Sequence, residues 1–320
     1  MPTSGHSSSR GDPLSAPTAE NAGSATAGVP QPRRKRRSRG RGLVTTALLF
    51  PAAFWYLVLL VLPLAIVVLY SFGTRGTDGG YTPAFVFDNY ETLFSRPDPF
   101  ILSLLVAVTG TAACLFIGFP FAYFLATRAG KRKTLLLVLL VIPFWTSFLV
   151  RTIAWLIILG PDGLEGFIQT LTGVDVAILG SPWAILLGIV YNYLPLMVFP
   201  LYVTLERLDP TLLEASKDLG AGRWATFRQI TLPISLPGLI TGSILVFIPL
   251  MGEYVIPSIL GLGKVFLIGN VLQLDFLGSR NWPAGSAKAV TLIVVMLVSV
   301  TFYVWTSTRS QSGGRDVSVL

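Results

Sequence analysis

The residues that most often carry out catalysis or bind metals are scarce in this chain. His6 is the single histidine and Cys114 the single cysteine among 320 residues. A Ser-His-Asp triad or a histidine metal site needs a fixed histidine, whereas His6 lies in a tail rich in Ser, Gly and Pro. One cysteine excludes an intramolecular disulfide framework and a cysteine-based metal cluster. The residue inventory therefore predicts no metal, no cofactor and no hydrolytic enzyme.

ATP hydrolysis is not expected from this chain either. A phosphate-binding loop needs Gly, four residues, Gly, Lys and then Ser or Thr, so that backbone amides and a lysine can surround the phosphates. The nearest approach is Gly263-Lys264, but Ser258 stands at the position of the first glycine and Val265 follows the lysine. Any ATP hydrolysis must belong to a partner chain.

Two ionisable residues, Glu253 and Arg151, lie within long apolar stretches. Charged groups at membrane depth are costly, which makes both functional candidates. Glu253 is predicted in the outer half of the bilayer, where it contacts a cation on a translocation path, pairs structurally with Arg151 or lies in a water-filled outer vestibule. For Arg151 we favour a structural or interface role, because an unpaired positive charge there would repel a cationic solute.

Three further residues are candidates for the translocation path. Tyr254 follows Glu253, and Asn192 falls in the middle of an apolar stretch, where an amide can hydrogen-bond across helices or contact a solute. Trp145 follows Pro143 by two residues, and its indole face suits either packing or a cation.

The composition predicts that these residues are positioned by membrane-spanning helices. Hydrophobic residues make up 52% of the chain, charged residues only 12%, and the mean hydropathy is +0.67. One soluble core cannot bury this excess, whereas about 20 apolar residues suffice to cross a bilayer. Six stretches are long enough, near 43–71, 101–127, 134–159, 182–205, 237–260 and 287–308. Prolines inside them predict several kinks.

Lysine and arginine predict the orientation of these six spans, because cytoplasmic loops retain positive charge. Alternate connecting segments carry eighteen and four Lys and Arg residues, and the richer set includes both terminal tails. Both termini are therefore expected in the cytoplasm. The net charge of +8 follows from this topology, so no nucleic-acid partner is needed. Residues 1–42 read as a disordered basic tail, 43–308 as the membrane domain and 309–320 as a short tail.

The connection between spans four and five, residues 206–236, has the pattern of a structured segment. Asp209 before Pro210 is an N-cap followed by an N1 proline, and Gly220 suits a left-handed C-terminal cap. A second amphipathic piece at 223–230 is predicted to end at Leu232-Pro233. Such a helix docks either on another protein or in the lipid headgroups.

This segment resembles the EAA motif of permease subunits from binding-protein-dependent ABC transporters. The matching residues are Glu214, Ala215, Gly220, Ile230, Leu232 and Pro233, with Ser216 where the family usually has alanine. The resemblance implies that Glu214, Ala215, Ser216 and Gly220 form a cytoplasmic coupling helix, which sits in a groove of a separate ATP-binding subunit.

Other stretches resemble the spermidine/putrescine branch of that family. They include Asp88-Asn89-Tyr90, residues 142–152, Gly252-Glu253-Tyr254 and residues 281–285. The resemblance implies an all-α fold of six spans like that of type I ABC importers. It also implies a permease path for a small cationic solute, two ATP-binding subunits, a second homologous permease as a heterodimer partner, an extracytoplasmic solute-binding protein and contact with membrane lipid.

Two alternatives stay open. The solute could be another small molecule, such as an amino-acid-like compound, an opine or a metal chelate. An ATP-independent secondary transporter is less favoured, because it predicts inverted repeats that residues 43–159 and 182–308 do not display.

Overall fold

The structure is a computed structural model, and it describes residues 39–312. The predicted disorder of the basic tail falls largely outside this range and stays a prediction. The long helices are α1 (Arg39–Ser71), α3 (Asp98–Thr127), α7 (Pro182–Leu205), α10 (Leu232–Met251) and α13 (Trp282–Ser312). The shorter ones are α2 (Asp88–Ser95), η1 (Gly130–Arg132), α4 (Lys133–Val141), η2 (Ile142–Trp145), α5 (Phe148–Leu159), α6 (Leu164–Thr172), α8 (Pro210–Asp218), α9 (Arg223–Thr226), η3 (Phe227–Thr231), α11 (Val255–Leu260), α12 (Ile268–Gln273) and η4 (Leu274–Gly278).

The predicted all-α class is confirmed. Among the described residues, β pairing is limited to one isolated bridge between Thr74 and Thr82. The chain divides after Tyr56 into two units, so α1 contributes to both. The second unit, from Leu57 onward, contains all the other helices.

Six apolar spans are present when one bent pair is counted as a single span. Five helical segments of the described chain are long and apolar enough to cross a membrane. The remaining span, third along the chain, was predicted as one helix over 134–159, and this prediction was wrong. The span consists of two helical parts, Gly130–Trp145 and Phe148–Thr172, which meet at an angle of 94°. Pro143 lies in the 3₁₀ turn η2, and Thr146 after it is extended, which ends the first half of the span.

Span five also differs from its predicted bounds of 237–260. Helix α10 ends at Met251, and Gly252 to Tyr254 separate it from α11. At its other end α10 continues directly from α9 and η3, so one helical segment runs from Arg223 to Met251. The prediction that Leu232-Pro233 closes the preceding helix was therefore wrong.

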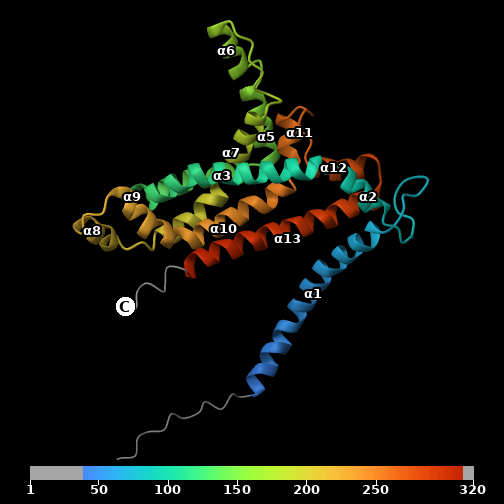
Figure 1. The fold of residues 1–320 in the computed structure, drawn as a ribbon, viewed down its shortest axis with the longest axis horizontal. Coiled ribbons are helices and arrows are strands. Elements are labelled where there is room, and N and C mark those ends of the chain that lie inside the picture. The colour runs from blue at the N-terminus through green and yellow to red at the C-terminus, as the bar shows by residue number, and fades with distance from the viewer. Residues whose placement is uncertain (1–38, 313–320) are drawn as a thin grey trace, which may run out of the picture. The chain divides into compact units, whose positions relative to one another are not determined.

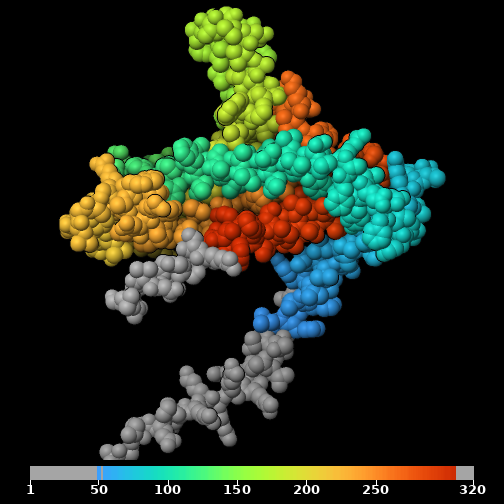
Figure 2. Space-filling model, in the orientation of Figure 1, coloured from blue at the N-terminus to red at the C-terminus, as the bar shows by residue number. Residues whose placement is uncertain are grey.

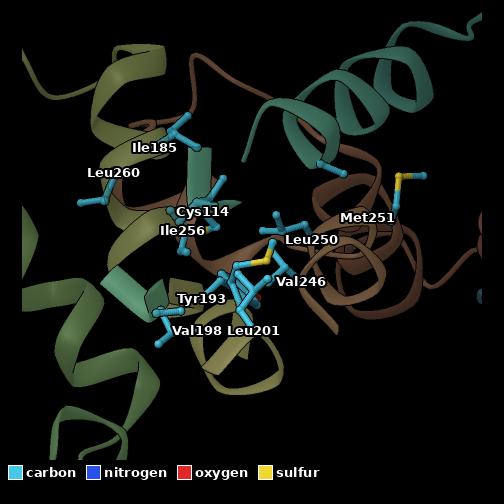
Figure 3. Close-up of a cluster of buried hydrophobic side chains, with 14 of the residues drawn as sticks. Cys114, Ile185, Tyr193, Val198, Leu201, Val246, Leu250, Met251, Ile256 and Leu260 are labelled. Carbon is cyan, nitrogen blue, oxygen red and sulfur yellow. The ribbon is translucent and has the colours of Figure 1, made fainter. Parts of the chain in front are cut away.

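Helices α3, α7 and α10 pack against one another, and α13 lies along α10 (Figure 1). Small residues allow this close approach: a Cβ added at Gly238 would lie 2.5 Å from the carbonyl oxygen of Pro200. Figure 3 shows the buried side chains between these helices, among them Cys114, Tyr193 and Leu250. Cys114 is a buried free thiol, as its apolar span predicts.

The outer surfaces of the long helices are apolar as well. Large exposed hydrophobic side chains on α13 include Leu297, Val298 and Phe302, and α3 exposes Phe116. Such surfaces are suited to lipid and not to water. Helices α8 and α9 form the surface at one end of the bundle, whereas α2 and α12 lie at the other end (Figures 1 and 2).

Candidate functional site

The segment between spans four and five forms the predicted helix α8. The carboxylate of Asp209 accepts a 2.9 Å hydrogen bond from the backbone N–H of Thr211, and Pro210 occupies the first turn. That N–H favours the charged carboxylate, so the pKa of Asp209 lies below its usual value. The predicted N-cap is confirmed.

The other end of α8 is closed by the turn that Gly220 was expected to make. Gly220 has φ +78°, and its N–H donates to the Lys217 carbonyl at 2.9 Å. The N–H of Ala221 donates to the Ser216 carbonyl at 3.0 Å. These two bonds form a Schellman motif, in which a left-handed residue satisfies the last carbonyls of a helix.

Ser216 links α8 to α9. Its side chain is buried, and its hydroxyl lies 2.8 Å from the hydroxyl of Thr226. Serine at a position where alanine is usual therefore has a partner across the turn. The sequence gave no sign of Thr226, because the pairing depends on how the turn places the two helices.

The candidate coupling residues fall into two groups. Glu214 and Ala215 are exposed on α8, beside the turn at Gly220. Ile230 lies in the π-helical turn η3 and Pro233 in the first turn of α10, away from the exposed face of α8. Two apolar side chains that were not among the candidate site residues add to the surface of this segment: Leu219 is 87% exposed and Trp224 is 73% exposed.

The π turn has a local cause. Pro233 has no N–H, and in a regular α-helix its ring would collide with the carbonyl of Gln229, four residues earlier. In η3 the N–H of Leu232 instead donates to the carbonyl of Phe227, five residues earlier. The Phe227 ring packs edge-on against Phe119 of α3, with centroids 5.5 Å apart. This turn therefore lies against a neighbouring span.

An ion pair joins the start of span three to the end of span four. Lys133 Nζ lies 2.6 Å from Glu206 Oε1, and the Tyr202 hydroxyl donates to the same oxygen at 2.7 Å. The hydrogen bond from Lys133, then that from Tyr202, holds the pKa of Glu206 below its usual value. The sequence did not indicate this pair, whose members are 73 positions apart.

Glu253 lies in the interruption between α10 and α11 and is buried, with 6% exposure. Its Oε1 accepts hydrogen bonds from the N–H groups of Val255 at 2.8 Å and Ile256 at 3.2 Å. Its Oε2 accepts one from the Tyr193 hydroxyl at 2.5 Å. Glu253 thus caps α11 and bonds to α7, and in this conformation it forms no ion pair with Arg151.

Arg151 is buried in the first turn of α5, with 8% exposure. Its guanidinium carbon lies 4.8 Å from the ring centroid of Phe144 and 5.9 Å from that of Phe148. Nε and Nη1 have no hydrogen-bond partner among the described residues.

The other candidate path residues lie in different environments. The amide of Asn192 is buried and donates to the Gly188 carbonyl of its own helix at 2.9 Å, and its oxygen has no hydrogen-bond partner among the described residues. Tyr254 is 41% exposed and Trp145 is 86% exposed. The structure brings Glu253 together with span four through Tyr193, the residue after Asn192.

Comparison with known proteins decides the family. The family model for the binding-protein-dependent transport system inner membrane component matches residues 118–311. The chain belongs to this family. As an inner membrane component it is a multi-pass membrane permease of the ABC importer class.

Relatives of this inner membrane component extend over most of its length. It is 40% identical over 263 residues to the spermidine/putrescine transport system permease protein PotB of Escherichia coli K12, covering 80% of this chain and 94% of that one. The PotB protein of Haemophilus influenzae is 37% identical over 269 residues, covering 81% and 92%.

A solved structure has the same fold. It is a chain of a bacterial ABC transporter involved in the import of the acidic polysaccharide alginate, with a TM-score of 0.63 at 20% identity, covering 84% of this chain and 96% of that one. At this identity the likeness concerns the fold alone.

Proposed function

We propose that this inner membrane component forms part of the translocation path of an ATP-driven importer for polyamines of the spermidine and putrescine type. The observation that carries the proposal is its 40% identity to a spermidine/putrescine permease over 94% of that protein. Its charge distribution is compatible with a cationic solute, since Glu253 is the one carboxylate buried in the described part of the chain.

In this proposal α8 and α9 are the contact with a separate ATP-binding subunit. Three features of the segment support it: the helix is capped at both ends, Glu214 and Ala215 are exposed, and Leu219 and Trp224 present apolar surface to a partner. Ile230 and Pro233 act behind this contact, because they connect it to α10. Closure of the ATP-binding subunits moves α8, and the spans respond.

The assembly has four kinds of chain in this proposal. Two ATP-binding subunits hydrolyse ATP, a second homologous permease completes the path, and an extracytoplasmic solute-binding protein delivers the solute. The termini and α8 face the cytoplasm, which the distribution of lysine and arginine supports. The opposite end, with α2 and α12, faces the binding protein (Figure 1).

On the translocation path we place Glu253, Tyr254, Trp145 and Asn192. Tyr254 and Trp145 are accessible in this conformation, whereas Glu253 and Asn192 are buried. A solute ammonium group reaches Glu253 only after the packing around this side chain opens, since it is 6% exposed and both of its oxygens accept hydrogen bonds from the protein.

Uptake of labelled spermidine tests the solute. The chain is produced with its neighbouring transporter subunits in cells that lack their own polyamine import, and unlabelled putrescine and an unlabelled amino acid serve as competitors. We expect ATP-dependent uptake that putrescine competes with and the amino acid does not. If the assembled transporter hydrolyses ATP fully but takes up no spermidine, the polyamine assignment is excluded.

Substitution of Glu214 tests the coupling contact. Glu214→Ala should lower co-purification of the ATP-binding subunit and uptake together. Glu91→Ala, which replaces an exposed acid on α2 at the other end of the bundle, is the matched control and should leave co-purification of the ATP-binding subunit unchanged. Unchanged association and uptake in Glu214→Ala would remove α8 from the contact.

A further inference from the structure

Arg151 and Glu253 are the two charged side chains that the described part of the chain buries. Each lies at an interruption of a span. Arg151 is in the first turn of α5, directly after the bend at 146–147, and Glu253 lies between α10 and α11. Helices α5 and α11 pack against each other. The two charges therefore belong to neighbouring half-helices.

The hydrogen-bonding of the two groups is unequal. Glu253 accepts three hydrogen bonds, from Tyr193, Val255 and Ile256. Arg151 instead lies over the rings of Phe144 and Phe148, and its Nε and Nη1 have no hydrogen-bond partner among the described residues. Ring faces attract a cation but accept no hydrogen bond of ordinary strength. A buried guanidinium in this condition is destabilised relative to one paired with a carboxylate.

Few carboxylates are near enough to pair with Arg151. Helices α6, α7 and α11 pack against α5, and neither α7 nor α11 contains Asp or Glu. Glu165 of α6 already accepts the N–H groups of Ile178 and Leu179, both at 2.6 Å. Two carboxylates lie in the connections beside these helices: Asp162, between α5 and α6, is exposed, whereas Glu253, two residues before α11, is buried.

A chain of ring contacts links Arg151 to the partner of Glu253. The Phe148 ring centroid lies 5.9 Å from the guanidinium carbon and 6.3 Å from the Tyr193 ring centroid. Tyr193 in turn bonds to Glu253. A shift of α5 along α11 that takes Phe148 out of this contact would move Arg151 with it, because both lie on α5.

We propose that Arg151 and Glu253 form an ion pair in a second conformation of the transporter, in which the guanidinium replaces the Tyr193 hydroxyl on Oε2. The inference rests on the proposed function, since the transport cycle supplies the second conformation. The present arrangement and the paired one are then the two discrete states of a switch at the helix interruptions. Pairing also neutralises a positive charge that opposes a cationic solute.

Cysteine cross-linking tests the approach of the two positions directly. Cys114→Ala removes the only cysteine of the chain, and Arg151→Cys with Glu253→Cys is then introduced into the complete transporter in lipid nanodiscs. We expect the cross-linked fraction to differ at least threefold between nucleotide-free transporter and transporter trapped with ATP and vanadate. Equal fractions in both states would overturn the proposal. No solute is needed, so failure of polyamine uptake and failure of the ion pair are separate results.

A double-mutant cycle in the native charge background provides the second measurement. Arg151→Gln and Glu253→Gln should each lower the initial uptake rate about tenfold or more, with assembly retained. The initial uptake rate of the double variant should be at least five times the rate obtained by multiplying the two single losses. As a matched control, Arg96→Gln, an exposed arginine outside the spans, should combine multiplicatively with Glu253→Gln. If the losses in uptake rate from Arg151→Gln and Glu253→Gln multiply in the same way, the pair is excluded. It is also excluded if Arg151→Cys cross-links to a cysteine introduced at a carboxylate position of the second permease instead.

Discussion

The Tyr193 hydroxyl donates a 2.5 Å hydrogen bond to Glu253 Oε2, and this bond joins span four to the interruption that follows α10. The same carboxylate caps α11 through its other oxygen. Three separate helices, α7, α10 and α11, are therefore positioned by one buried acid. Any movement of α11 relative to α7 must first break or carry along this contact.

Tyr193→Phe removes the donor and leaves Glu253 Oε2 buried without it. Bonds to charged groups are worth about 1.5–3 kcal/mol, so we expect a clear decrease in the thermal stability of the assembled transporter. Tyr191→Phe, at an exposed position on the same helix, is the matched control. Equal melting temperatures for the two variants would mean that the bond contributes nothing to stability.

Gly220→Ala should disturb the turn after α8 through the backbone alone. A Cβ there meets no atom within 4 Å, but φ is +78°, a conformation that costs an L-residue about 1–2 kcal/mol. We expect weaker association with the ATP-binding subunit and slower uptake. Gly222→Ala is the control, because its Cβ also meets nothing and its φ is −68°. Similar losses in both variants would point to the added methyl group and not to the turn.

Ser216→Ala removes one half of the hydroxyl pair that joins α8 to α9, and Thr226→Val removes the other. Each should destabilise the segment by about 0.5–1.5 kcal/mol, the usual net worth of a hydrogen bond. The double variant should lose little more than either single one, since both remove the same bond. Hydrogen exchange of the backbone amides of residues 210–231 measures the stability of the segment in each variant. Fully additive losses of stability in the double variant would contradict the pairing.

The Lys133–Glu206 pair should not respond to pH near neutrality. Its hydrogen bonds hold the pKa of Glu206 below the ordinary value of about 4.3, so the contribution of the carboxylate is fully present above that value. It is lost only as the pH falls through the lowered pKa. We therefore expect the ratio of uptake rates between the native protein and Glu206→Gln to stay constant from pH 6 to pH 8. A ratio that changes over this interval would show that another titrating group controls the pair.

The sequence predicted those features whose causes are local. Helix α8 was placed correctly because Asp209, Pro210 and Gly220 determine its ends by themselves. The number of spans followed from the length of the apolar runs, with the bent pair counted as one. Span four matched its predicted bounds, 182–205, to the residue.

The interruptions at 146–147 and 252–254 are only two or three residues long, so hydropathy averaged over about 19 residues does not separate the half-helices, although the prolines predicted kinks. The partner of Glu253 was equally hidden, since Tyr193 is 60 positions away and reaches it only once α7 and α10 have packed. One signal was available: a glutamate two residues before the start of α11 is suited to cap its first N–H groups.

The unbroken helical segment from Arg223 to Met251 has a mechanical consequence. It contains 29 residues, which at about 1.5 Å per residue gives a rod of about 43 Å. Because a helix resists stretching, a displacement of its α9 end along the axis is carried through to Met251. In the proposed assembly, work done on α9 by the ATP-binding subunit is therefore delivered to a point two residues from Glu253.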